Sequence, residues 1–94
     1  MPRRIEYDPA KDARNVITRE LPFADAASFQ FTTAVIDQDV RRPYGEARYQ
    51  ALGYLGERLH MLIFTHIDDG IRVISFRKAN RREVSRYTQE TTAT

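Results

Sequence analysis

The sequence predicts an α+β protein: a small, mostly antiparallel sheet with two N-terminal helices packed on one face and a C-terminal helix. Three observations predict this class. Apolar residues recur at helical spacing between residues 9 and 30. Short β-rich segments, separated by Gly and Pro, follow from residue 32 onward. The last of these segments runs into a helix-start signal near residue 80.

The length and composition indicate one globular domain. The chain has 94 residues, of which 41% are hydrophobic and 30% are charged, which suits a single small core. We therefore expect one domain over residues 1–94, with an ordered part from about 4 to 88.

The composition also excludes some kinds of site. There is no cysteine, so we expect no disulfide and no thiolate zinc site, and we expect neither a metal nor a cofactor. No apolar run approaches the roughly 20 residues that cross a bilayer, and none follows the N-terminus as in a signal peptide. We therefore expect a cytoplasmic protein with no membrane contact.

The first helix is predicted from about Pro9 to Arg19. Asp8 is a favourable N-cap, and Pro9 suits the first helical position because its missing N–H would have no partner there. The inner face is expected to consist of Ala10, Ala13, Val16 and Ile17. Before this helix, the alternating segment Ile5–Tyr7 can pair at a sheet edge.

A second helix is predicted from about Pro22 to Gln30, after Leu21-Pro22-Phe23 ends the first. Its apolar stripe at helical spacing is formed by Phe23, Ala26, Ala27 and Phe29. The small alanines allow close packing, so we interpret this segment as part of the core and assign it no chemistry.

Three strands are predicted in the middle of the chain, over residues 32–37, 48–55 and 59–67. The third is the most apolar run and is expected to be the central strand. The segment 38–46 contains Pro43 and Gly45, so we expect a loop there. It also carries side chains that can contact a polyanion, although solvated loop charge is the simpler explanation: Arg41, Arg42 and Tyr44.

The dipeptide Asp69-Gly70 predicts a tight hairpin between the strand 59–67 and the strand that begins at Ile71. With these two residues as the loop, the side chains of the two strands divide between two faces. One face is expected to be open and to carry His66, Val73, Ser75 and Arg77. The other is expected to pack against the N-terminal helices and to carry Ile63, Thr65, Ile67, Arg72, Ile74 and Phe76.

The stretch from Ile71 to Tyr87 carries the strongest signal. Its first half is rich in β-branched residues, and Asn80 and Glu83 then have the spacing of a capping box that starts a helix. It holds five Arg, one Lys and one Glu, a net charge of +5, whereas the whole chain carries only +2. Arg binds phosphate through a rigid planar fork. We therefore expect this strand-to-helix junction to gather several guanidinium groups around one anion, with solvated helix charge as the alternative.

Four segments of the sequence resemble motifs of the BrnT family of toxins, and together they cover most of the chain. They are Tyr7-Asp8-Pro9-Ala10-Lys11 with Asn15, Phe23-Ala24-Asp25-Ala26, Glu46-Ala47-Arg48-Tyr49-Gln50-Ala51-Leu52-Gly53, and Ile71-Arg72-Val73-Ile74-Ser75-Phe76-Arg77-Lys78-Ala79 with Arg81, Arg82, Glu83 and Tyr87. Two positions depart from the family pattern. Thr18-Arg19-Glu20 stands where the family commonly has Lys-His-Gly, and Phe76 stands where it has a small residue.

The resemblance implies a small α/β ribonuclease toxin with a RelE-like sheet. Such toxins are encoded beside an antitoxin, usually a ribbon-helix-helix DNA-binding protein, that blocks the toxin and represses the shared promoter. The partners implied here are an RNA substrate and a BrnA-like antitoxin, with DNA contacted only through the antitoxin.

Metal-free RNA cleavage by attack of the 2′-OH on the adjacent phosphate needs a base, an acid and positive charge on the phosphorane. Arginine stays protonated, so it can supply only the charge. We assign Arg77 and Arg81 to the scissile phosphate, with Arg48 and Lys78 in support.

Proton transfer needs other side chains. We single out His66, because histidine exchanges protons most readily near neutral pH, with Glu46 and Tyr87 as alternatives, and we interpret His60 as structural. Further RNA contacts are expected from Lys78, Arg82, Arg72, Tyr87 and Arg86. The rival hypothesis is a non-catalytic RNA- or protein-binding module that uses the same basic junction.

Overall fold

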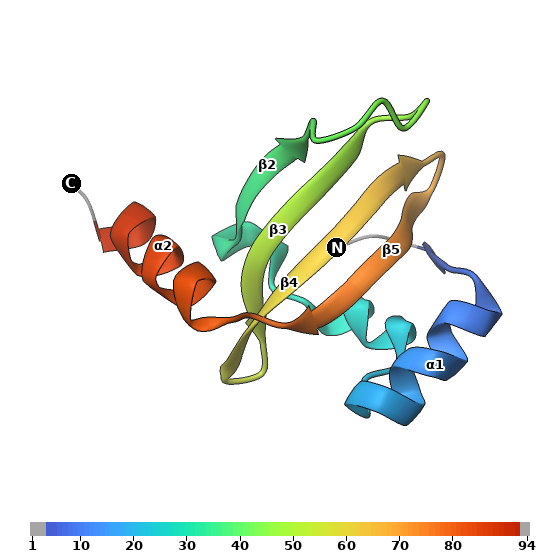
Figure 1. Ribbon diagram of the computed structural model, residues 1–94, viewed down its shortest axis with the longest axis horizontal. Coiled ribbons are helices and arrows are strands. Elements are labelled where there is room, and N and C mark those ends of the chain that lie inside the picture. The colour runs from blue at the N-terminus through green and yellow to red at the C-terminus, as the bar shows by residue number, and fades with distance from the viewer. Residues whose placement is uncertain (1–3, 93–94) are drawn as a thin grey trace.

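The computed structural model describes residues 4–92 and shows one sheet with helical segments around it (Figure 1). Its elements are β1 (Arg4–Glu6), α1 (Pro9–Arg19), the 3₁₀ segments η1 (Phe23–Ser28) and η2 (Phe31–Thr33), β2 (Val35–Asp39), β3 (Arg48–Leu55), β4 (Arg58–Ile67), β5 (Gly70–Lys78) and α2 (Arg81–Thr92). Within this described part of the chain, no helix is both long and apolar enough to span a bilayer.

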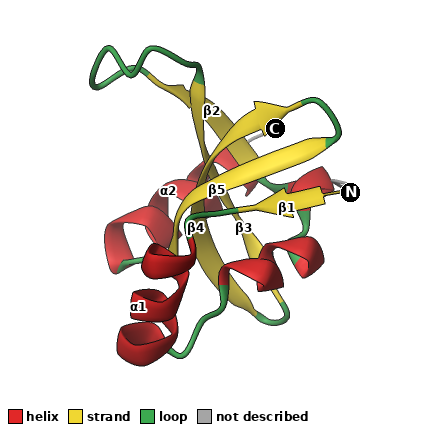
Figure 2. Cartoon of the chain, turned by 90° about the vertical axis from the view of Figure 1, so that its right-hand side faces the viewer, coloured by secondary structure: helices red, strands yellow, loops and turns green. Residues whose placement is uncertain are grey.

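The five strands form a mixed sheet in the order β1-β5-β4-β3-β2. Neighbouring strands are antiparallel except β1, which runs parallel to β5 at the edge (Figure 2). The α+β class and the mostly antiparallel sheet are therefore confirmed.

Helix α1 has the predicted bounds, and its N-cap, Asp8, accepts a hydrogen bond from the N–H of Ala10 at 2.9 Å. Its predicted inner face is wrong, because Ala10, Ala13, Val16 and Ile17 are all exposed. A buried side chain ties the helix to the sheet. The amide nitrogen of Asn15 donates to the backbone carbonyls of Leu21 and Phe76, at 2.8 and 3.0 Å. Asn15 belongs to the first family motif, and its amide has a structural role. Without it, the buried carbonyls of Leu21 and Phe76 would lose this donor, which would destabilise the fold.

A second helix forms where it was predicted, but it is the shorter 3₁₀ segment η1 over Phe23–Ser28 and not an α-helix over Pro22–Gln30. The spacing of the buried residues gives the reason. Phe23, Ala26 and Phe29 are 2%, 0% and 1% exposed and recur at every third position, and a 3₁₀-helix has about three residues per turn. These side chains join the core as expected, on a different backbone.

Strands β3 and β4 lie where they were predicted, but β2 does not. It spans Val35–Asp39 and not residues 32–37, because residues 31–33 form the turn η2, which is closed by a hydrogen bond from the Ala34 N–H to the Phe31 carbonyl at 3.2 Å. The loop that was expected from residue 38 therefore begins after Asp39.

The turn between β4 and β5 consists of Asp68-Asp69, and not of Asp69-Gly70 as predicted, since Ile67 pairs with Gly70. Gly70 has no positive φ, so the turn is not the reason for a glycine at this position. A Cβ at Gly70 would lie 1.9 Å from the carbonyl oxygen of Arg4. Gly70 therefore allows β1 to approach β5, a contact between distant parts of the chain that the dipeptide does not reveal.

A β-bulge in β5 changes which side chains share a face. Phe64 pairs with Val73. The next pair is Ile63 with Ser75, so Ile74 is the extra residue. One inserted residue reverses the alternation of side chains beyond it.

The bulge separates His66 from Arg77. His66 lies on the face covered by the N-terminal segments, with its ring against Phe64. Arg77 pairs with Met61 and lies on the opposite face. The prediction that His66 and Arg77 share a face is therefore wrong, whereas the buried position of Phe76 against the N-terminal segments is confirmed.

The core has two parts, one on each face of the sheet. The larger part lies between the sheet and the N-terminal segments and consists of Leu21, Phe23, Ala26, Phe29, Ala51, Leu62, Phe64, Ile71, Val73 and Phe76. The smaller part lies beside α2 and consists of Leu52, Leu59, Met61, Ala79 and Tyr87. Helix α2 lies toward one end of this second face (Figure 1), which we call the open face.

Candidate functional site

The open face carries a line of polar and charged side chains that crosses all five strands. The ladder pairs Glu6 with Arg72 and Arg72 with Thr65. On the other side it pairs Arg48 with Asp39, and the residue before Arg48 accepts a hydrogen bond from the Thr65 hydroxyl at 2.7 Å. We call the charged members of this line and the adjoining carboxylate the charged row: Glu6, Arg72, Glu46, Arg48 and Asp39.

Glu46 lies between the two arginines of the charged row. Its Oε2 is 3.4 Å from Nε of Arg48, and its Oε1 is 3.7 Å from Nη1 of Arg72. One strand separates β3 from β5, so the two arginine backbones are about 10 Å apart, and the carboxylate occupies the space between their guanidinium groups. The side chains of Glu46, Arg48 and Arg72 are 36%, 26% and 41% exposed, so a ligand can reach all three.

Each arginine of the charged row has a second contact. Cζ of Arg48 lies 4.2 Å from the centre of the Tyr44 ring, in a cation–π arrangement. Nε of Arg72 donates to Glu6 at 2.6 Å. These contacts restrict where the two guanidinium groups point. Each guanidinium nevertheless has more N–H donors than these contacts use, so donors remain for a ligand.

A buried carboxylate anchors the loop beside the charged row. The side chain of Asp39 is 1% exposed and accepts hydrogen bonds from Arg41 and Tyr44. These bonds, with those from Arg41 first, hold the pKa of Asp39 well below its ordinary value, against the opposing effect of burial. The carboxylate is therefore ionised at neutral pH, and the loop supplies its hydrogen-bond donors.

The strand-to-helix junction begins as predicted. Asn80 and Glu83 form the reciprocal capping box, in which each side chain accepts the other residue's N–H at 2.9 Å. The same Glu83 carboxylate also binds Arg77 through two parallel hydrogen bonds of 2.8 and 2.9 Å. These bonds raise the pKa of Arg77 and lower the pKa of Glu83. Arg77 is therefore occupied by an internal partner.

The junction does not gather its cations around one anion, as the sequence led us to expect. Arg81 and Arg82 are exposed on the first turn of α2 and have no ion-pair partner among residues 4–92. Lys78 pairs with His60 and lies on the other face of the sheet from Arg77, and Arg86 pairs with Asp37. The reason is geometric: neighbours alternate across a strand and diverge by about 100° around a helix.

The candidates for proton transfer are also separated. His66 lies on the face opposite the charged row, where its ring contacts Tyr49. Tyr87 is buried, and its hydroxyl donates to the carbonyl of Thr33 at 2.9 Å. Of these three candidates, Glu46 alone lies between guanidinium groups. Within residues 4–92, no group of three His, Asp or Glu side chains is arranged to hold a metal ion.

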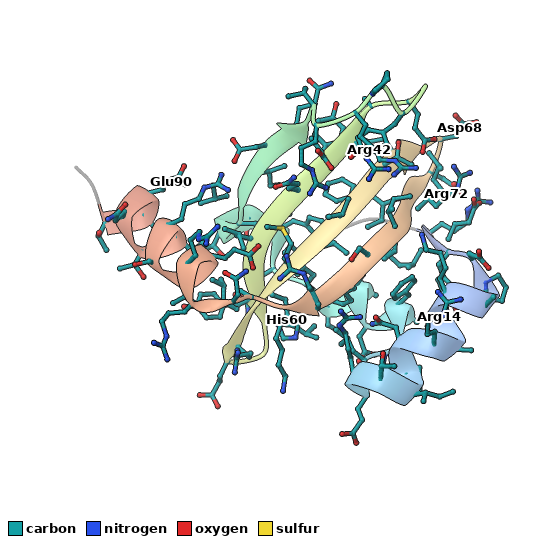
Figure 3. All side chains as sticks on the ribbon, viewed as in Figure 1. Arg14, Arg42, His60, Asp68, Arg72 and Glu90 are labelled. Atoms are coloured by element: carbon teal, nitrogen blue, oxygen red, sulfur yellow. The ribbon has the colours of Figure 1, made fainter. Side chains whose placement is uncertain are left out.

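His60 is buried, 4% exposed, at the end of the sheet opposite Arg72 (Figure 3). Its Nδ1 lies 2.8 Å from the carbonyl of Arg58. Burial lowers the pKa of His60 from its ordinary value of 6.5. The ring is therefore neutral near neutral pH, which agrees with the structural interpretation of this residue.

Three residues of the site were not predicted as such: Asp39 was assigned no role, and Arg41 and Tyr44 were interpreted as solvated loop charge. One local signal was available. An aspartate that ends a strand can accept the N–H of the residue two positions on, and Asp39 does so from Arg41 at 3.2 Å. Nothing local indicates that Tyr44 also contacts Arg48.

The fold and the charged row define a small α+β protein with a site suited to a phosphate-bearing ligand, since paired guanidinium groups bind phosphate oxygens through their forked donors. Residues 7–83 match the family described as "Ribonuclease toxin, BrnT, of type II toxin-antitoxin system". The chain therefore belongs to the BrnT family of ribonuclease toxins, which confirms the resemblance seen in the sequence. Membership of a type II toxin-antitoxin family implies an antitoxin partner.

One solved structure supports this assignment. The crystal structure of the Brucella abortus ribonuclease toxin BrnT is 26% identical in sequence and has a TM-score of 0.63, and the match covers 82% of this chain and 96% of that chain. No curated protein matches the sequence.

Proposed function

We propose that this protein is a metal-independent endoribonuclease whose reaction takes place at the charged row. The observation that carries this proposal is the Glu46 carboxylate between the guanidinium groups of Arg48 and Arg72. This arrangement puts a proton acceptor beside two groups that bind phosphate. Membership of a ribonuclease toxin family supports RNA as the substrate.

In the proposed reaction, Glu46 accepts the proton of a ribose 2′-OH. The 2′-oxygen attacks the adjacent phosphorus, and the bond between phosphorus and the 5′-oxygen breaks. Arg48 and Arg72 stabilise the negative charge that develops on the phosphorane. The leaving 5′-oxygen takes a proton from water, and Glu46 releases its proton to the solvent. The products are a 2′,3′-cyclic phosphate and a 5′-hydroxyl.

The junction has a different role in this proposal. Arg77 lies on the open face, as the charged row does, and its guanidinium group is paired with Glu83. The Arg77 side chain is 31% exposed, so we assign it a contact with the RNA backbone and not with the reacting phosphate. The exposed Arg81 and Arg82 bind the RNA backbone outside the reacting position.

The test is cleavage of a single-stranded RNA by the purified protein in the presence of EDTA. We expect Glu46→Gln to lower the cleavage rate by about 10²–10⁴-fold, the usual range for loss of a general base. A 2′-deoxy substitution at the cleaved position should stop the reaction. Arg14→Ala removes an exposed positive charge from α1 (Figure 3) and should leave the rate unchanged.

Two outcomes would contradict the proposal. RNA that is bound by the wild-type protein but stays intact would favour the non-catalytic binding module. Cleavage that disappears in EDTA would contradict the metal-independent mechanism.

We also propose that the antitoxin is a BrnA-like ribbon-helix-helix protein and that the toxin reaches DNA only through it. We further propose that the toxin is cytoplasmic and that its sheet is RelE-like. The family description supports an antitoxin partner, and its type is our proposal. The product of the neighbouring reading frame should co-elute with the toxin in size-exclusion chromatography, and this complex should retard its own promoter DNA. Retardation by the toxin alone would contradict the proposal.

A further inference from the structure

The ion pair between Asp39, a member of the charged row, and Arg41 has no role in the reaction proposed above. The carboxylate side chain is 1% exposed, whereas the Arg41 side chain is 64% exposed. Asp39 is the last residue of β2, and all four hydrogen bonds to its carboxylate come from the following loop. They are donated by Nε and Nη2 of Arg41 at 2.8 Å each, by the Arg41 N–H at 3.2 Å and by the Tyr44 hydroxyl at 3.1 Å. A buried carboxylate is destabilising unless such bonds are made, so this set closes the loop.

The cross-strand register places Asp39 opposite an arginine to which it is not bonded. Asp39 and Arg48 are direct partners in the ladder between β2 and β3, and opposite charges at such positions attract one another. Asp39 is nevertheless bonded to Arg41, and Arg48 is bonded to Glu46. The loop therefore occupies the carboxylate that would otherwise compete with Glu46 for Arg48.

Tyr44 connects the two ion pairs. Its hydroxyl donates to Asp39, and its ring lies 4.2 Å from Cζ of Arg48. Because the hydroxyl end of the ring is held by a buried group, the ring is a fixed surface for the guanidinium group. Arg48 thus has Tyr44 as one neighbour and Glu46 as the other.

We infer that Asp39, Arg41 and Tyr44 form a positioning clamp that keeps the guanidinium group of Arg48 beside Glu46, where the phosphate would bind. The effect of the clamp on rate rests on the proposed function. Its three residues act through Arg48, and none of them needs to touch the reacting atoms.

The first test asks whether a second substitution restores the activity that a first one removes. Arg41→Ala leaves Asp39 free to capture Arg48, so kcat should fall about 10- to 100-fold, as expected for a misplaced catalytic group. KM should change little. Adding Asp39→Asn removes the competing carboxylate and should restore kcat to within a few-fold of the wild type. If Arg41 contacts the RNA directly, Asp39→Asn will restore nothing, and the clamp is overturned.

A second variant keeps the inference testable if the doubly substituted protein does not fold. Tyr44→Leu removes the ring and should lower kcat by about two- to tenfold. In the background of Arg48→Ala it should cost nothing further, because both substitutions act on one guanidinium group. Additive losses would overturn the clamp.

An NMR signal tests the clamp without cleavage. The ring current of Tyr44 should displace the Nε–Hε signal of Arg48. That displacement should be lost in Tyr44→Leu and in Arg41→Ala, and kept in Arg42→Ala, which removes the neighbouring exposed arginine (Figure 3). A wild-type protein that does not cleave RNA contradicts the proposed function, but the Arg48 signal still decides the inference. A signal that Arg41→Ala leaves unchanged overturns it.

Discussion

The charged row and the strand-to-helix junction both contain arginine and glutamate, but they hold them differently. In the row, Glu46 is shared between Arg48 and Arg72 at 3.4 and 3.7 Å. At the junction, Glu83 binds Arg77 alone, through bonds of 2.8 and 2.9 Å. The longer, shared contacts leave donors and an acceptor for a ligand, whereas the bidentate pair is already satisfied. A high local density of arginine in the sequence therefore does not by itself give free guanidinium groups, because the carboxylate partners decide which of them are available.

The largest effect that distinguishes the two regions is expected in kcat. Arg72→Ala removes a donor to the phosphorane, so kcat should fall about 10²–10³-fold. Arg77→Ala should keep kcat within a few-fold of the wild type and mainly weaken RNA binding. Single-turnover cleavage over a range of protein concentrations measures both quantities. A greater loss of kcat in Arg77→Ala than in Arg72→Ala would locate the reaction at the junction and reverse the comparison.

The next effect concerns the stability of the junction. Glu83→Gln keeps a side chain that can close the capping box but removes the charge that holds Arg77. Because hydrogen bonds to charged groups contribute about 1.5–3 kcal/mol, the free energy of unfolding should fall by roughly 1–2 kcal/mol after partial solvent screening. Urea denaturation measures the change. Glu57→Gln, at an exposed position in the turn between β3 and β4, is the control, and an equal loss there would show that the pair adds no stability.

A smaller effect depends on pH and on His60, which pairs with Lys78 at the junction end of the sheet. Burial lowers the pKa of His60 below its ordinary value of 6.5. As the pH falls below 6.5, the unfolded chain binds a proton that the folded chain does not bind. The free energy of unfolding should therefore decrease with falling pH, until the lowered pKa is reached.

The carboxylates with lowered pKa values lose their stabilising effect in a separate range. The pKa of Asp39, bonded to Arg41, and that of Glu83, bonded to Arg77, are ordinarily 3.8 and 4.5, so their contribution is lost only at lower pH. Denaturation between pH 6.5 and about 5 therefore separates the contribution of His60 from those of Asp39 and Glu83. His60→Gln should flatten the dependence, and His66→Gln should keep it. An unchanged slope in His60→Gln would refute this assignment.

The smallest effect tests the outer part of the junction. Arg82→Ala should reduce the slope of log K against log salt for single-stranded RNA by about 0.7, the value for one phosphate contact. Fluorescence anisotropy in the Glu46→Gln background measures binding without cleavage. The same slope as in the parent protein would remove Arg82 from the RNA-binding surface.

The parts of the fold that were predicted correctly depend on neighbours in sequence. Asp8-Pro9 sets the start of α1, and the spacing of Asn80 and Glu83 sets the start of α2. The parts that were missed depend on distant contacts. Gly70 is required by the approach of β1, and the bulge at Ile74 fits β5 to β4. No short stretch of sequence contains that information.

In the candidate site, too, features set by sequence neighbours differ from features set by distant contacts. Glu46, Arg48 and Arg72 were all among the predicted residues, but Arg77 and Arg81 were placed first because they are close together in sequence. Arg77 is paired with Glu83 and Arg81 is exposed at the start of α2, whereas Glu46 and Arg72 come together from separate elements. The predicted role of His66 depended on the hairpin register, which the bulge changes.

The sequence by itself determined the family, the helix starts and the presence of many guanidinium groups. The tertiary structure decided which carboxylate each guanidinium meets and which arginines are therefore available to a ligand. The physical reason is that these pairings follow from strand register, a bulge and a loop closed on a buried aspartate, and all three are settled by contacts between residues far apart in the chain.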